Sequence, residues 1–220
     1  MGSITRSFAN NIGSSGILSA SAVTNATIED VTSFDNAASS ATLVLLSTQT
    51  ASSSATISFT TGLDSTYDAY EFHFINLHPA TDSVQIQFNG STDSGSNYNV
   101  TKTTTFFKAE HNETDTGTGL GYDGGLDLAQ STAFQSLSAS VGNDNDQNIS
   151  GFLQLFNPSS TTYVKHFISH VSTAEASDYL RDDYVAGYFN TTSAINAIQF
   201  KMSSGNIDDG IIKLYGVKKS

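Results

Sequence analysis

Oxygen-bearing side chains recur at alternate positions of the segment DNDQN, where Asp144, Asp146 and Asn148 could direct oxygen ligands at one cation. Ca²⁺ prefers such ligands, but the segment lacks the glycine at the sixth position and the glutamate at the twelfth that complete an EF-hand loop. The alternative is a polar hairpin turn. The sequence therefore offers these three residues as candidates for a weakly bound Ca²⁺ and predicts no other cofactor.

Paired acidic residues are the other feature that could perform catalysis, because two carboxyl groups at a fixed separation hydrolyse glycosidic bonds. Adjacent residues of a strand point to opposite faces, so neighbouring acids seldom converge on one substrate. We therefore expect turn residues and no catalytic residue, with a glycan-active enzyme as a minor alternative. The pairs are Asp123 with Asp127, Asp182 with Asp183, and Asp208 with Asp209.

The histidines give no metal site either. His166 and His170 fall on one face of a predicted strand, but residues four apart on a strand are about 13 Å apart, too far to share a metal directly. The chain also has no cysteine, which excludes disulfides, thiolate catalysis and cysteine-bound zinc. These histidines are predicted to be surface or interface residues.

Charge and hydropathy limit the partners. The 220 residues carry a formal net charge of −12, which argues against nucleic acid and anionic membrane as partners. The apolar runs are too short for a membrane span or a secretory signal. We expect a protein that binds neither nucleic acid nor membrane.

Alternation of apolar and polar residues with a period of two dominates the chain after about residue 39. Tyr70, Phe72 and Phe74 are separated by single polar residues, the pattern of a strand with one buried face. Clusters of Gly, Asn, Asp and Ser separate such runs. The pattern predicts an all-β fold for residues 39–220, an antiparallel β-sandwich of the jelly-roll type. The predicted strands cover 42–47, 55–59, 70–77, 84–88, 100–108, 149–156, 163–171, 184–189, 197–202 and 211–217.

The sequence predicts two further features within residues 39–220. The stretch 109–147 is rich in glycine and acidic residues, which predicts long loops at one end of the sandwich. The last run, 211–217, needs strand partners for its backbone, so it should close the sandwich with Ile211 or Ile212 facing inward.

The N-terminal segment differs from the rest. Residues 1–38 show no sustained period, and their apolar residues are too many for a disordered tail and too scattered for a core. The segment is therefore predicted to be an anchoring arm that orders on another surface; the alternative is one or two strands of the same domain. The anchoring residues would be Ile4, Phe8, Ile12, Ile17, Leu18, Val23, Ile28, Val31 and Phe34.

Three segments of the sequence resemble segments of a known family of proteins. They are the opening SITRSFANNI with SGILSASAVTNATIEDVT, the middle LDSTYDAYEFHFINLHPATDSVQIQFNGSTDSGSNYN and the ending SSGNIDDGIIKLYGVK. Together they resemble virion structural proteins of tailed bacteriophages, particularly those of marine bacteria. The resemblance covers most of the chain and weakens in 109–147. It implies a component of the virion that is assembled in the cytoplasm of the host bacterium, and it brings no site residues.

These observations together predict a non-enzymatic virion structural protein. The first expectation is a capsid decoration or cement protein whose arm binds the major capsid protein or another virion protein. The alternative is a tail-fibre protein or receptor-binding adhesin that contacts a host surface glycan through 109–147. Because virion components assemble with closed rotational symmetry, we expect a homotrimer, with a dimer as the second choice.

Overall fold

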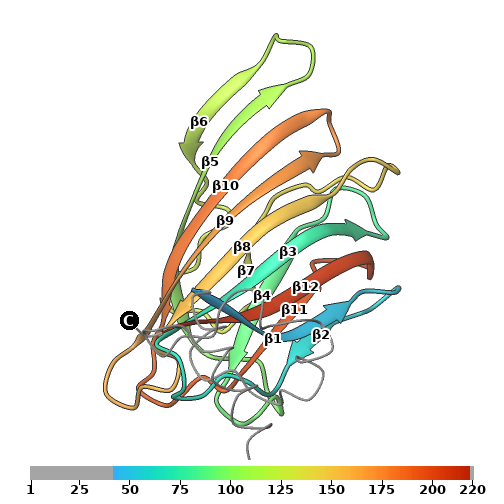
Figure 1. Ribbon diagram of the computed structural model, residues 1–220. Coiled ribbons are helices and arrows are strands. Elements are labelled where there is room, and N and C mark those ends of the chain that lie inside the picture. The colour runs from blue at the N-terminus through green and yellow to red at the C-terminus, as the bar shows by residue number, and fades with distance from the viewer. Residues whose placement is uncertain (1–41, 219–220) are drawn as a thin grey trace, which may run out of the picture. The chain divides into compact units, whose positions relative to one another are not determined.

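The computed structural model describes residues 42–218, and every regular element in this range is a β-strand (Figure 1). The chain divides into two units between Ala41 and Thr42, and the described residues belong to the second unit. The predicted arm, residues 1–38, and its anchoring residues lie outside the described range. Within that range, no helix is long and apolar enough to cross a membrane.

Twelve strands form two antiparallel sheets. The larger sheet has the order β1-β12-β3-β8-β9-β10-β5-β6, and the smaller has the order β2-β11-β4-β7. All the predicted runs are strands, β8 and β11 with the predicted bounds; β6 and β7 were not predicted. The strands are β1 (Leu43–Thr50), β2 (Ile57–Phe59), β3 (Ala69–Pro79), β4 (Ile86–Ser91), β5 (Lys102–Asn112), β6 (Thr118–Tyr122), β7 (Gln135–Ser136), β8 (Ile149–Phe156), β9 (Lys165–Glu175), β10 (Tyr179–Phe189), β11 (Ala197–Met202) and β12 (Ile207–Val217).

Eight of these strands have the connectivity of a jelly roll. When β1, β2, β3, β4, β7, β8, β11 and β12 are numbered from one to eight along the chain, one sheet reads 1-8-3-6 and the other reads 2-7-4-5. This is the order of two interlocked Greek keys. The four remaining strands, β9, β10, β5 and β6, extend the larger sheet beyond β8 (Figure 1). The predicted antiparallel sandwich of the jelly-roll type is confirmed.

Aromatic rings from both sheets fill the space between them. Phe200 of β11 lies with its ring centroid 5.2 Å from each of Phe72 and Phe74 on β3. Phe88 of β4 lies 5.0 Å from Phe167 of β9. All five side chains are buried. Because alternate residues of a strand face the opposite sheet, the period of two in the sequence produces this core directly.

The C-terminal strand is an interior strand of the larger sheet. β12 pairs with β1 on one side and with β3 on the other, and Ile212 is fully buried. The prediction that the last strand closes the sandwich with one of two isoleucines facing inward is confirmed, and the isoleucine is Ile212.

The expectation of long loops over 109–147 is wrong in part, because 109–112, 118–122 and 135–136 lie in β5, β6 and β7, whereas 123–134 and 137–147 belong to no named strand. Its first residues continue β5, which pairs with β6 to form a hairpin. The segment 123–142 then runs along the edge of β5, where Thr104 N donates to Leu128 O, contributes β7 to the smaller sheet, and returns to the larger sheet, where Gly142 N donates to Ala174 O. Leu137 of this segment is fully buried. Backbone hydrogen bonds hold the segment in place, and they leave no pattern in its glycine and polar side chains. The order of this segment is therefore not visible in the sequence.

Candidate functional site

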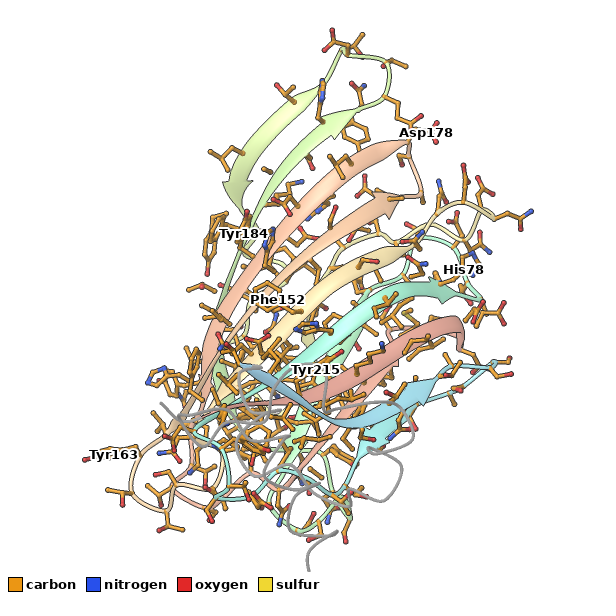
Figure 2. All side chains as sticks on the ribbon, viewed as in Figure 1. His78, Phe152, Tyr163, Asp178, Tyr184 and Tyr215 are labelled. Atoms are coloured by element: carbon orange, nitrogen blue, oxygen red, sulfur yellow. The ribbon has the colours of Figure 1, made fainter. Side chains whose placement is uncertain are left out.

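The larger sheet has two faces with different environments. Residues paired across strands share a face: Tyr184 of β10 is opposite Phe107 of β5 and His170 of β9. Asp183 and Val185, the residues on either side of Tyr184 in β10, are buried on the inner side. We call the face that carries Tyr184 the outer face. Figure 2 shows it with Tyr184, Phe152 and Tyr215 labelled on β10, β8 and β12.

Exposed apolar side chains gather on this outer face. The described residues include nine exposed large apolar side chains, and the register places eight of them on the outer face. The ninth, Tyr163, lies in the loop before β9 (Figure 2). Exposed large apolar side chains concentrated on one face of a sheet favour that face as a contact site for a partner. The eight are Leu45, Ile75, Phe107, Leu120, Tyr122, Phe156, Ile168 and Leu180.

Ring side chains form one continuous row across the outer face, which we call the aromatic row. Phe107 and Tyr184 stack with centroids 4.8 Å apart and planes 3° apart, and Tyr184 and His170 stack at 4.2 Å and 13°. Phe152 meets His170 edge to face at 6.1 Å. In strand order, the row is Tyr122, Phe107, Tyr184, His170, Phe152 and His73.

The stacking decides what the centre of the row can bind. Nearly parallel rings at these separations cover each other's faces, so Tyr184 presents its edge, and not its face, to a partner. A sugar that stacks flat on an aromatic face would find both faces of Tyr184 occupied. Ring edges and aliphatic side chains instead suit packing against the side chains of another protein, where Tyr and Phe are enriched.

The two acidic side chains beside the row, Asp182 and Glu71, form hydrogen bonds with ring side chains of the row. Asp182 Oδ1 lies 2.6 Å from His170 Nε2, and the Tyr184 hydroxyl donates to Asp182 Oδ2 at 2.9 Å. This hydrogen bond raises the pKa of Tyr184 above its usual value, because the neighbouring carboxylate stabilises the protonated hydroxyl. His73 Nε2 and Glu71 Oε2 are 2.8 Å apart. Each acid beside the row therefore already has a partner.

One end of the outer face is hollowed. The hollow has a volume of about 570 Å³ and is lined by the end of β5 and the turn after it, the start of β8, the end of β9 and the start of β10. Figure 2 labels Asp178, in the turn between β9 and β10. Ala174 and Leu180 contribute apolar lining. The side chains of Asn148, Ser172 and Tyr179 also line it, and none of them donates or accepts a hydrogen bond with another described residue. Their polar atoms are available to a ligand.

The calcium candidates lie in a turn beside this hollow. Gln147 N donates to Asp144 O at 2.9 Å, and Asp144 N donates to the Gln147 side chain at 3.1 Å. Across residues 42–218, no group of three His, Cys, Asp or Glu side chains is placed to hold a metal ion. The turn that the sequence offered as the alternative is present; a weak Ca²⁺ site at Asp144, Asp146 and Asn148 stays a prediction.

Two of the three acidic pairs do not converge on a common cleft, whereas Asp208 and Asp209 both line a small hollow beside His78. Asp182 lies on the outer face, whereas Asp183 is fully buried on the inner side. Asp123 contacts Arg181 at 3.2 Å, and Asp127 accepts a hydrogen bond from the Tyr122 hydroxyl. The rule that adjacent acids on a strand point apart is confirmed for Asp182 and Asp183.

Sequence reasoning missed a buried ionic cluster on the inner side of the extended part of the sheet. Arg181 Nε donates to Asp183 Oδ1 at 2.9 Å, and the Arg181 guanidinium lies 3.2 Å from Asp123, 3.5 Å from Glu175 and 3.7 Å from Glu110. Burial raises the pKa of Asp183 to about 6, although Arg181 acts in the opposite direction. Arg181 and Asp183 share β10, but Glu110, Glu175 and Asp123 come from β5, β9 and the segment after β6, so no local pattern marks the whole cluster.

Two buried lysines were also missed. Lys102 Nζ donates to Val100 O at 3.2 Å and to Ala133 O at 2.5 Å, and burial lowers the pKa of Lys102 to about 7. Lys165 Nζ donates to Tyr163 O at 2.9 Å and to Thr191 O at 3.1 Å. Both ammonium groups donate to carbonyl oxygens of loops, so each lysine holds a loop against the start of its strand, β5 or β9.

Comparison of the chain with protein-family models, with curated proteins and with solved structures found no match in any of the three.

Proposed function

We propose that this protein is a non-enzymatic structural component of a bacteriophage virion, with a capsid decoration or cement protein as its specific form. The observation that carries the proposal is the gathering of eight exposed apolar side chains on one sheet face. A subunit of a particle needs such a face because neighbouring subunits cover it. Jelly-roll sandwiches occur in viral capsid proteins, although the fold alone does not fix a function.

The proposal divides the chain into two working parts. The sandwich, with its own aromatic core, is the displayed body, and residues 1–38 anchor it to the major capsid protein or another virion protein. The mature location is therefore the virion, after assembly in the cytoplasm of the host bacterium. The resemblance of the chain to phage structural proteins supports this assignment.

Replacing three arm residues, Phe8, Ile12 and Ile17, by serine in the full chain is expected to weaken binding to particles assembled without the protein by at least about tenfold. The loss follows because the variant removes apolar side chains that would be buried against the particle. Co-sedimentation of purified protein with such particles measures it. The matched control replaces Ser14 and Ser19 by alanine, which should bind like the wild type. Full binding by the three-residue variant would overturn the anchoring role.

A second candidate function is contact with a host surface glycan at the hollow. Its specific support is the set of unpartnered polar side chains beside apolar Ala174 and Leu180, an arrangement typical of small-ligand sites. Residues 111–113 and Asp115 also line it, so part of its wall comes from the stretch 109–147, for which glycan contact was predicted. The aromatic row does not support this function, because its central ring faces are covered.

Filling the hollow tests that candidate. Ser172→Trp should weaken binding to an immobilised neutral host polysaccharide by about tenfold or more, because the indole occupies the space of the sugar. Thr105→Trp, on the same face but on the other side of the aromatic row, is the matched control. Biolayer interferometry with both variants gives the comparison. Equal binding by the two variants would reject the hollow as the glycan site.

A further inference from the structure

We propose that the outer face of the larger sheet packs against the same face of a second copy of this chain, so that the protein is a dimer with two-fold symmetry. The inference rests on the proposed function in one respect: it takes the outer face as a surface that a protein partner covers. It adds the identity of that partner and the symmetry of the assembly.

The size of the face is sufficient for a lasting interface. Eight strands lie side by side in the larger sheet, and at a spacing of about 4.8 Å they span about 38 Å. A strand of 8 residues such as β8 adds a length of about 26 Å. The face therefore offers about 1,000 Å², compared with the roughly 800 Å² per partner that a stable interface of standard size buries.

Charge favours this face over the remaining surface for contact between two copies. The chain carries a formal net charge of −12, so two copies repel each other when most of their surfaces approach. In the central rows of the outer face, the charged side chains are Glu71, Asp182 and Lys213, two acids and one base that leave a formal net charge of −1 on these rows. Two copies can therefore meet here with little like-charge repulsion.

The side chains of the face suit contact with themselves. Phe107, Ile168 and Leu180 are 44%, 42% and 56% exposed and stand on three neighbouring strands. Twisted sheets pack face to face with their strands about 30° apart, and side chains of both sheets then interlock. The outward-facing edges of Phe107 and Tyr184 can enter the gaps between rows of the second copy.

Symmetry distinguishes the dimer from the homotrimer that was expected from the sequence. One face that packs against itself is an isologous contact and closes with two subunits, whereas a trimer requires two different complementary surfaces on each subunit. The described residues hold eight of their nine exposed large apolar side chains on one face. The distribution therefore fits the two-subunit assembly.

The test measures the mass of the full chain in solution by light scattering and its dissociation constant by sedimentation equilibrium. The wild type should have twice the chain mass of 23.3 kDa. Phe107→Glu combined with Ile168→Glu should weaken the dimer by about a hundredfold or more, because four buried charges would face an apolar surface. Leu180→Glu, at a more exposed position, serves if the double variant fails to fold. Tyr163→Glu, an exposed tyrosine off the face, is the control and should remain dimeric.

The outcomes separate this inference from the proposed function. A dimer that the face variants dissociate and the control does not would support the inference. A wild-type monomer, a trimer, or a dimer unaffected by the face variants would overturn it, and hydrogen exchange protection of the face in a monomer would mean that another part of the chain covers it. Particle binding by a monomer would leave the proposed function standing, whereas a dimer that binds no particle would reject only that function.

Discussion

Phe200→Ala is expected to lower the free energy of unfolding by about 3–5 kcal/mol, the usual range for removing a fully buried phenylalanine. Phe200 has no exposed surface and lies at the centre of the ring cluster between the two sheets. Its ring makes edge contacts with Phe72 and Phe74 at 5.2 Å and with Phe59 at 6.3 Å. Alanine would leave a cavity among rings that are held by two sheets and cannot collapse into it.

Equilibrium unfolding in urea measures this effect, and Phe200→Leu gives an internal comparison because it retains most of the side-chain volume and should cost less than about 1.5 kcal/mol. The control is Tyr163→Ala, whose side chain is 71% exposed and whose loss should stay within about 0.5 kcal/mol. A loss below 1 kcal/mol for Phe200→Ala would contradict the central position of Phe200 in the core.

Arg181→Met should destabilise the protein by about 3–5 kcal/mol near neutral pH, because it leaves buried carboxylates without their cation. The Arg181 side chain is 5% exposed, and Asp183, its closest partner at 2.9 Å, is fully buried. Methionine keeps part of the volume, so the cost comes mainly from the uncompensated charge. Lys108→Met is the matched control: it removes the partner of Glu110 at 2.6 Å from a site with 24% exposure and should cost about 1 kcal/mol or less.

The cost of Arg181→Met should depend on pH with a defined sign. The pKa of Asp183 in the folded protein, about 6, is above its ordinary value of 3.8. The stabilising contribution of protonated Asp183 is therefore fully present below about pH 3.8 and is lost as the pH rises through about 6. Removing Arg181 raises this pKa further, so the variant should lose more stability at pH 8 than at pH 5. Equal losses in urea unfolding at both pH values would show that Asp183 does not carry the effect.

Much of the fold could be predicted from local patterns. Alternation in segments such as 70–77 and 84–88 identified β3 and β4, because the side chains of a strand alternate between a buried and a wet face. The boundaries were less accurate where apolar residues give way to polar ones. β10 begins at Tyr179, five residues before the predicted start, because Arg181 and Asp183 occupy inward positions that a core pattern reserves for apolar residues.

The candidate site could be predicted only in part. The sequence placed His166 and His170 on one face as surface or interface residues, and the structure confirms their shared face. It did not identify Phe107 and Tyr184 as neighbours, because they are 77 positions apart and meet only through the pairing of β5 with β10. It also described 109–147 as loops, although this stretch contains β6 and β7 and backbone hydrogen bonds hold parts of 123–142 against β5 and β9.

The sequence by itself determined that this protein is an antiparallel sandwich, since period two, turn residues and the absence of cysteine leave packed strands as the means of burying its aromatic residues. The tertiary structure alone decided which side chains share the outer face and which charges surround Arg181. The physical reason is that strand order and register depend on contacts distant in sequence, whereas the inward or outward direction of a side chain follows from its position along one strand.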